Sequence, residues 1–387
     1  MRIQTIRAFP SSSIPRSQLH GACFRCQLTS SRSLYSSFDL INHHPARRRQ
    51  STLAQAVSVA SNIFSNATSR AASPGGVSVD PLRMVAKEMK FLTGNIRQLL
   101  GSGHPSLDTV AKYYTQAEGK HVRPMIVLRL AEITELIHTA SLLHDDVIDH
   151  SVSRRGNASA NLEFGNKMAV LAGDFLLSRA SVALARLRDA EVTELLATVI
   201  ANLVEGEFMQ LKNTAQDEKN PVWTEETISY YLQKTYLKSA SLISKSCRAA
   251  ALLGGSDAVT VDAAYDYGKN LGLAFQLVDD MLDYTISEEE LGKPAGADLE
   301  LGLATAPLIF AWKNNKELGT LVGRKFSQEG DVSRARALVL QSDGLDQTRA
   351  LAEEYANRAI AAIDAFPESE AKDGLVEMAV KTLKRRK

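Results

Sequence analysis

Residues 141–155 read SLLHDDVIDHSVSRR, and this stretch determines how the rest of the chain is interpreted. It carries Asp145 and Asp149 four residues apart, behind an apolar run with helical spacing. Residues four apart lie on the same face of an α-helix, so the two carboxylates are expected to lie together. Such a pair beside an apolar stripe repels itself and resists transfer from water unless a cation neutralises it.

A second acidic cluster, LVDDMLD, repeats this geometry with Asp279 and Asp283, and Asp280 lies between them. Two such helices that face each other would form a cage of carboxylate oxygens. Ligands of this kind suit Mg²⁺, which binds few carboxylates and completes its octahedron with water and phosphate oxygens. One cluster alone would more often be a solvated acidic surface, but two clusters behind apolar helices favour a metal site.

The composition indicates an acidic body behind a basic leader. Residues 1–79 contain nine Arg, no Lys and one acidic residue, whereas the remainder carries 36 basic and 43 acidic residues. An Arg- and Ser-rich leader is typical of a mitochondrial transit peptide, so we expect residues 1–50 to be one and residues 51–79 to be a disordered linker. A nucleic-acid-binding arm is the alternative for the leader, but the acidic body argues against nucleic acid as the main partner.

Helical spacing dominates residues 80–387, which we expect to form one all-α domain. Asp80-Pro81 has the form of a helix start, with Asp at the cap and Pro in the first turn. Long Ala- and Leu-rich patterns follow, and no alternating pattern predicts strands. No run of about eighteen apolar residues predicts a membrane span. Both acidic clusters therefore belong to helices of a bundle.

Basic and polar residues accompany the two clusters. Arg154 and Arg155 follow the first one, and guanidinium groups match the oxygens of a diphosphate. His138 lies two helical turns before Asp145 on the same side, although a lone helical His is more often a core residue. Further candidates for the same site are Lys234, Thr235, Lys238, Gln276 and Lys293. Together they predict a metal site with cationic groups for a diphosphate around it.

Six segments carry a resemblance to a known family. They read LLHDDVIDHSVSRRG, GDFLLSRA, GEFMQL, YLQKTYLKSASL, GLAFQLVDDMLDY and GKPAGADLELGLATAPLIFA. With them the chain resembles the trans-prenyltransferases, most closely the mitochondrial long-chain polyprenyl diphosphate synthases that make the ubiquinone side chain. The resemblance covers residues 80–387 and implies an isoprenoid-synthase-type helical bundle with a central active-site cavity.

The resemblance also implies roles for single residues. The implied Mg²⁺ ligands are Asp145, Asp149, Asp279 and Asp283, with Asp280 in support, and the implied catalytic set is Asp145, Asp149, Asp279 and Lys234. Allylic diphosphate binding, with farnesyl or geranylgeranyl diphosphate as the primer, falls to Arg154, Lys234, Thr235, Gln276 and Lys293. Isopentenyl diphosphate binding falls to Lys120, Arg123, His138 and Arg155.

The resemblance further implies a homodimer or heteromer in the mitochondrial matrix, peripherally associated with the inner membrane. The growing product would pass the residues one turn before Asp145, which are Ala140 and Ser141. A large aromatic side chain there would close the pocket, whereas these small side chains leave it open. We therefore expect a long-chain product.

The chain departs from the family between its isopentenyl motif and its first acidic cluster. Only 22 residues separate Arg123 from Asp145, and Met125–Asp149 reads as one helical pattern. In one helix, at 1.5 Å per residue, Arg123 would lie about 33 Å from Asp145, so one substrate could not contact both. We therefore expect that a segment is missing between about Leu128 and Ala131. Two alternatives stay open: a non-catalytic partner subunit and a class I terpene cyclase.

Overall fold

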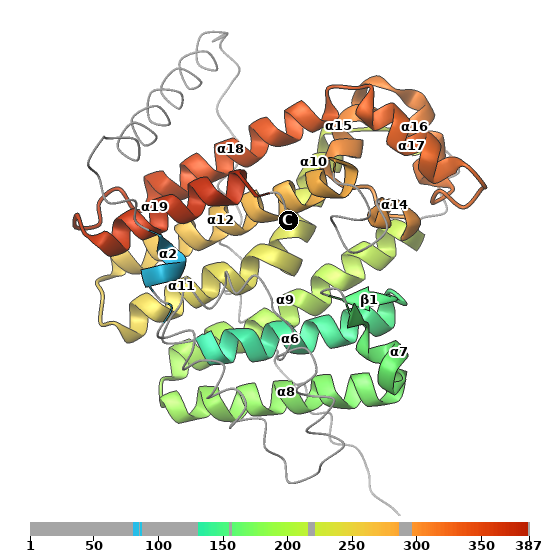
Figure 1. The fold of residues 1–387 in the computed structure, drawn as a ribbon. Helices are drawn as coiled ribbons and strands as arrows, with labels where there is room; N and C mark the ends of the chain where they lie inside the picture. Colours follow the sequence, from blue (N-terminus) through green and yellow to red (C-terminus); the bar gives the residue numbers. More distant parts are fainter. Residues whose placement is uncertain are drawn as a thin grey trace, which may run out of the picture. The chain divides into compact units, whose positions relative to one another are not determined.

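The computed structural model of the 387-residue chain describes residues 80–84, 86, 131–154, 157–215, 221–285 and 296–385. These residues form a helical bundle (Figure 1). The longer helices are α6 (Ala131–Ile148), α8 (Asn166–Leu187), α9 (Ala190–Ala215), α10 (Glu225–Thr235), α11 (Ser241–Leu253), α12 (Ala258–Thr285), α18 (Gly344–Ala362) and α19 (Glu370–Leu383). The shorter ones are α2 (Pro81–Met84), α7 (Ala160–Phe164), α14 (Ala297–Glu300), α15 (Ala306–Asn314), α16 (Lys316–Gly323) and α17 (Asp331–Leu340).

A π-helical turn and a pair of short strands interrupt the α-helical pattern. Five residues, Tyr236–Ala240, form a π-helical turn, η2, between α10 and α11. The two-residue strands β1 (Ser153–Arg154) and β2 (Asn157–Ala158) pair antiparallel just after α6. The all-α prediction is confirmed, and this short strand pair is a local feature that the sequence pattern did not indicate.

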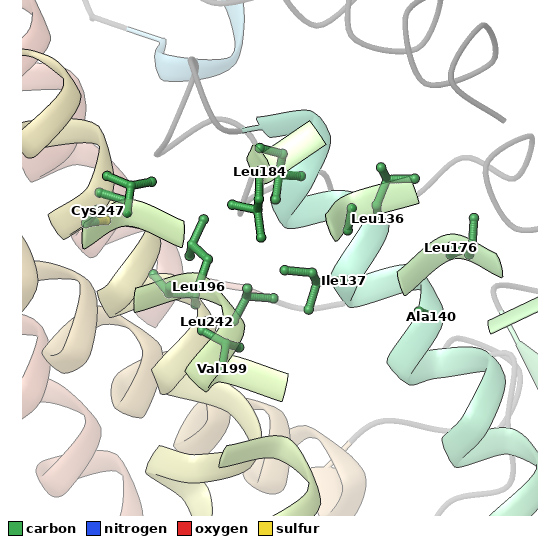
Figure 2. Packing of buried hydrophobic residues seen from close by; sticks show 14 of the residues in the cluster. Leu136, Ile137, Ala140, Leu176, Leu184, Leu196, Val199, Leu242 and Cys247 are labelled. Carbon is green, nitrogen blue, oxygen red and sulfur yellow. The ribbon is translucent and has the colours of Figure 1, made fainter. Parts of the chain in front are cut away.

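In the described part of the chain, the helices pack in layers around three clusters of buried apolar residues, and α6 contributes to the main one. In Figure 1, α6 lies along α8 in the lower part of the bundle, and α12 lies between α11 and α18 in the upper part. The buried residues of α6 recur at helical spacing, at Ile133, Leu136, Ile137, Ala140 and Leu143. Figure 2 shows Ile137 turned toward Leu196 and Val199 of α9 and Leu242 of α11. The apolar stripe of α6 thus fixes which side of the helix carries the acidic cluster.

Close contact between α6 and α8 depends on a glycine. A Cβ atom added at Gly173 would lie 2.2 Å from the Nε2 atom of His144, so only glycine admits the imidazole there. The same ring lies 3.5 Å from Asp174 and 3.2 Å from the carbonyl oxygen of Val170. His144 therefore joins α6 to α8 and has a structural contact rather than one in the cavity described below.

Helix α8 has the length and composition of a membrane-spanning helix, contrary to the expectation that no segment of the chain passes that test. Its buried side, with Ala169, Ala172, Leu176 and Ala180, belongs to the main core. Only 33% of the apolar window is buried, and Val170, Leu171 and Val182 on the other side of the helix are exposed.

The predicted helix start at Asp80-Pro81 is confirmed by α2, whose first residue is Pro81. Lys381 of α19 contacts Asp80 at 3.0 Å, which ties this start to the last helix. The predicted transit peptide (1–50) and linker (51–79) lie outside the described residues. So do four predicted site residues, which are Lys120, Arg123, Arg155 and Lys293.

Candidate active site

A cavity of about 420 Å³ lies where the end of α6 meets α10, η2, α12 and α14. Its acidic lining residues are Asp149, Asp280, Asp298 and Glu300, and its basic ones are Arg154, Lys234 and Lys238. Gln210, Tyr231, Thr235, Ser239, Gln276 and Thr305 add neutral polar groups. A chamber with both signs of charge and many hydrogen-bonding groups suits a small, highly charged ligand better than an apolar one.

The first acidic cluster reaches this cavity at the end of α6. The helix ends at Ile148, but the N–H of Asp149 still donates to the carbonyl oxygen of Asp145 at 2.7 Å, so the two carboxylates keep the predicted helical relation. Burial raises the pKa of Asp145 to about 6; the charge of Lys238 opposes this shift, and that of Glu207 adds to it. Burial also raises the pKa of Asp149. A bound cation would therefore stabilise both carboxylates in their charged form.

The third carboxylate of this cluster, Asp146, holds a neighbouring arginine. Asp146 is fully buried and accepts hydrogen bonds from two nitrogens of Arg154, one of them Nε at 3.0 Å. Arg154 belongs to β1, and the β1–β2 pair turns the chain so that this side chain comes back toward α6. Asp146 thus anchors an arginine at the cavity wall.

The second acidic cluster lies on α12, where Asp280 faces the cavity. Its carboxylate accepts from the Tyr231 hydroxyl at 2.6 Å, from Nε2 of Gln276 at 2.9 Å and from the backbone N–H of Ala306 at 3.4 Å. Burial raises the pKa of Asp280, and the hydrogen bonds and the charge of Lys234 oppose that shift. Burial lowers the pKa of Lys234, and the charge of Asp280 opposes it. The two buried groups therefore stabilise each other's charge at this wall.

The other two carboxylates of the second cluster point elsewhere. Asp279 does not line the cavity and accepts from the Arg385 guanidinium at 2.7 Å, which also lies 3.8 Å from the centre of the Phe275 ring. Asp283 is buried and accepts from the backbone N–H of Asp298 at 3.2 Å. Among the described residues, no group of three or more His, Cys, Asp or Glu is placed to hold a metal ion. The two clusters do share one chamber, through Asp149 and Asp280.

The predicted Mg²⁺ ligands of the first cluster fit the ion. Mg²⁺ needs only one or two carboxylates when water and phosphate oxygens supply the rest of its octahedron. Asp145 and Asp149 provide that pair, and their raised pKa values reflect burial and neighbouring carboxylates that a cation would offset. The assignment of all four carboxylates to the metal stays a prediction. Of the four, Asp149 alone lines the cavity, while Asp279 binds Arg385 and Asp283 accepts from the backbone of Asp298.

Lys238, a site candidate to which the resemblance assigned no role, lies at the cavity wall. Its ammonium group donates to Glu207 Oε2 at 2.5 Å and to Gln210 Oε1 at 3.1 Å, both on α9, and its side chain lines the cavity. Its charge is the largest influence that lowers the pKa values of Asp145 and Asp149. The sequence signal was its position four residues after Lys234, which put both lysines on one helical face.

The remaining predicted residues occupy different places. Thr235 and Gln276 line the cavity, and Gln276 accepts from the Ser239 hydroxyl at 2.7 Å. His138 is half-buried on α6 and does not line the cavity; its carbonyl oxygen accepts from the Ser141 hydroxyl at 2.8 Å. Ala140 is fully buried in the main core (Figure 2). The roles given to these three residues of α6 stay predictions.

Comparison with known proteins shows similarity to polyprenyl diphosphate synthases. The family model described as Polyprenyl synthetase matches residues 104–339. The chain is 68% identical to the Neurospora crassa protein named "Probable hexaprenyl pyrophosphate synthase, mitochondrial", over 407 residues that cover 89% of this chain and 91% of that protein. It is 40% identical to the mitochondrial hexaprenyl pyrophosphate synthase of Saccharomyces cerevisiae, over 444 residues that cover 83% of this chain and 94% of the relative.

A solved structure of a polyprenyl synthase is also similar to this chain. The polyprenyl synthase of Caulobacter crescentus, crystallised with calcium and isoprenyl diphosphate, is 34% identical and superimposes with a TM-score of 0.73. The match covers 79% of this chain and 97% of that one.

The sequence alignments are longer than the parts of this chain that they include. The alignment to the N. crassa protein spans 407 residues, whereas it covers only 89% of 387 residues here. The alignment to the S. cerevisiae protein, at 444 residues, is longer than the whole chain. These relatives therefore carry residues that have no counterpart in this sequence.

Proposed function

The chain belongs to the polyprenyl synthetase family, and from that premise we propose that it is a Mg²⁺-dependent, all-trans long-chain polyprenyl diphosphate synthase of mitochondria. Its relatives are named as hexaprenyl and decaprenyl diphosphate synthases, several of them mitochondrial. Such enzymes are prenyltransferases, and the Arg-rich leader of this chain suits import into mitochondria. The product would supply the ubiquinone side chain.

The observation that carries this proposal is the mixed charge of the cavity. Asp149 and Asp280 line it together with Arg154 and Lys238. A diphosphate ester accompanied by a divalent cation offers positive charge to the carboxylates and negative oxygens to the guanidinium and ammonium groups. Neither a neutral ligand nor a bare cation would satisfy both sets.

Each wall of the cavity has a role in this proposal. Asp145 and Asp149 would hold Mg²⁺, which when bound withdraws charge from the diphosphate leaving group. Arg154, held by Asp146, and Lys238, held by Glu207, would bind the diphosphate oxygens of the allylic primer. These two cationic side chains are oriented before substrate arrives, so they lose less conformational freedom on binding.

The polar groups of α10 and α12 would orient the primer from the opposite side. Ser239 fixes Gln276, and Gln276 and Tyr231 fix Asp280. This chain of hydrogen bonds keeps Asp280 aligned beside Lys234. Lys234, Thr235 and Gln276 would then complete the allylic site, as the resemblance implies.

The binding of the second substrate rests largely on residues outside the described part of the chain. Lys120, Arg123 and Arg155 would bind isopentenyl diphosphate together with His138. The double bond of isopentenyl diphosphate attacks the allylic carbon of the primer as the bond from that carbon to diphosphate breaks. The released diphosphate would accept the proton that the new chain loses. The apolar core around α6 would exclude water, which otherwise competes for the reacting carbon.

We also propose that a segment present in the relatives is absent from this sequence between about Leu128 and Ala131. The alignment lengths support a deletion, and the 22-residue spacing from Arg123 to Asp145 supports its position. If the segment is absent and Met125–Asp149 is one helix, Arg123 would lie about 33 Å from Asp145, too far for one substrate to contact both. We therefore expect the chain as given to bind isopentenyl diphosphate weakly.

The test is incubation of the purified chain with Mg²⁺, radiolabelled isopentenyl diphosphate and either farnesyl or geranylgeranyl diphosphate, with products sized by chromatography. Labelled long-chain polyprenyl diphosphates support the proposal. Incorporation only when a second subunit is added would favour the partner-subunit alternative. A cyclic hydrocarbon from the primer alone would favour a terpene cyclase.

A further inference from the structure

The position of Lys238 depends on an unusually close approach of α9 to the π-helical turn η2. A Cβ atom added at Gly206 of α9 would lie 2.6 Å from Lys238 Cγ, 3.1 Å from Leu237 Cβ and 3.2 Å from the backbone nitrogen of Lys238. The first of these distances is shorter than real Cβ contacts allow. Any side chain at position 206 would therefore displace the stem of Lys238.

The turn that carries Lys238 is held from two sides. Lys238 lies in the middle of η2, which is wider than an α-helix because the N–H of Ser241 reaches back to the carbonyl oxygen of Tyr236. On the side of α12, a Cβ atom added at Gly272 would lie 2.7 Å from Ala240 Cα. The π-turn is thus enclosed by Gly206 and Gly272, and a displacement away from α9 meets α12.

The residues around Gly206 also bind the ammonium group of Lys238. Glu207 follows directly, and Gln210 lies one turn later on the same helix. With no side chain at 206, the Lys238 stem can lie across α9 and reach both acceptors, at 2.5 and 3.1 Å. Glycine is unfavourable in the interior of a helix, so its presence here calls for a reason.

We propose that Gly206 is a positioning residue for Lys238: it allows the lysine stem to cross α9, so that the ammonium group is held at the cavity wall where the diphosphate binds. This inference rests on the proposed role of Lys238 in binding the allylic diphosphate. Gly206 itself contacts no substrate. Its effect on the reaction passes through Lys238, the residue whose side chain an added Cβ atom would meet first.

A purely structural glycine in the same bundle provides the matched control. A Cβ atom added at Gly268 of α12 would lie 2.8 Å from Ser244 Cα, 2.9 Å from the Ile243 carbonyl oxygen and 3.0 Å from Cys247 Sγ. That contact joins α12 to α11, and none of its members lines the cavity. Gly268→Ala therefore introduces the same methyl group into an equally tight contact without touching Lys238.

The experiment compares four full-length variants: Gly206→Ala, Gly268→Ala, Lys238→Ala and the double variant with Gly206→Ala and Lys238→Ala. Binding of inorganic pyrophosphate with Mg²⁺ is measured by calorimetry, and KM for the allylic primer and kcat are measured where turnover is present. We expect Gly206→Ala to weaken pyrophosphate binding and to raise KM by about tenfold or more, because a displacement of about 1 Å can cost that much. Gly268→Ala should lower the melting temperature and leave the pyrophosphate affinity and KM unchanged.

The double variant separates positioning from packing. In the Lys238→Ala background the Cγ atom is gone, so Gly206→Ala should add less than twofold to the loss of pyrophosphate binding. Additive losses would overturn the proposal, and so would a Gly206→Ala variant with unchanged affinity. If Lys238→Ala leaves pyrophosphate binding intact, the proposed role of Lys238 fails first and the inference falls with it.

Folding of the variants gives a second criterion. If Gly206→Ala does not fold, the double variant should, because the nearest clash is with the Lys238 side chain. A double variant that also fails to fold would show that the contact with the backbone of η2 dominates, and would overturn the proposal.

Discussion

Replacement of Asp145 by Asn should stabilise the fold while it removes activity. Burial raises the pKa of Asp145 from 3.8 to about 6, and the carboxylates of Glu207 and Asp149 contribute. A shift of about two units corresponds to roughly 3 kcal/mol between the charged and neutral forms. Since Asn is neutral and similar in shape, we expect a gain of about 1–3 kcal/mol in the free energy of unfolding at neutral pH.

The gain should depend on pH in a defined direction. The folded-state pKa of Asp145 lies above the unfolded value of 3.8. Below pH 3.8 the carboxyl is neutral in both states, so the wild-type chain does not bear the cost of burying a charge. As the pH rises through about 6, the buried carboxyl ionises and the chain loses stability. Asp145→Asn lacks this loss. Guanidinium unfolding at a pH near 4 and at a pH near 8 should therefore show little difference between the two chains in acid and the full difference in base. Mg²⁺ with pyrophosphate should stabilise the wild-type chain more than the variant.

Asp266→Asn provides the control. Asp266 is exposed on α12, so this substitution removes the same charge at a site away from the cavity. It should change the free energy of unfolding by less than about 0.5 kcal/mol at either pH. The reasoning would be refuted if Asp145→Asn were no more stable than the wild type at alkaline pH. An equal gain at both pH values would refute it as well, since an effect of charge must disappear in acid.

Three further predictions concern the same site and the product. Lys238→Gln should move the acid limb of the pH–rate profile to higher pH and Glu207→Gln to lower pH, because their charges have opposite effects on the pKa of Asp145; shifts in the same direction would contradict this. Ala140→Phe should shorten the products in chromatography, at a cost of about 1–3 kcal/mol from overpacking the core, and a folded variant with unchanged products would count against the assigned role. Transcript sequencing across codons 124–135 should reveal additional codons near 128–131, whereas an uninterrupted match to the given chain would exclude an error in the sequence.

Helical periodicity was enough to predict the architecture and the first acidic cluster. The apolar spacing of α6 determines its buried face, and the relation of Asp145 to Asp149 follows from the turn of the helix alone. Both are local properties of the chain. The start of α2 at Asp80-Pro81 was predictable for the same reason.

The direction of the second cluster was not predictable in this way. Asp279, Asp280 and Asp283 all lie within one half of α12, so spacing alone does not say which of them faces the cavity. The structure turns Asp280 there because Tyr231 and Gln276 bind it, while Arg385, more than one hundred residues away, binds Asp279. Gln276 lies on α12 itself, but Tyr231 and Arg385 come from other parts of the fold.

The different positions of Lys234 and Lys238 were not predictable for a related reason. Lys234 and Lys238 share a face in an ideal helix, but a π-helical turn lies between α10 and α11 and changes their relation. Lys234 is buried beside Asp280, and Lys238 extends to Glu207. No residue pattern in YLQKTYLKSASL predicts that turn, so both lysines were candidates and their different positions could not be foreseen.

The most direct test of the central claim is a crystal structure of the protein with Mn²⁺ in place of Mg²⁺ and with pyrophosphate, in which anomalous scattering locates the metal. The account predicts a metal peak in contact with the carboxylates of Asp145 and Asp149, and pyrophosphate in the cavity within hydrogen-bonding distance of Lys238 and Arg154. Metal bound only elsewhere, or pyrophosphate absent from this cavity at saturating concentration, would contradict it.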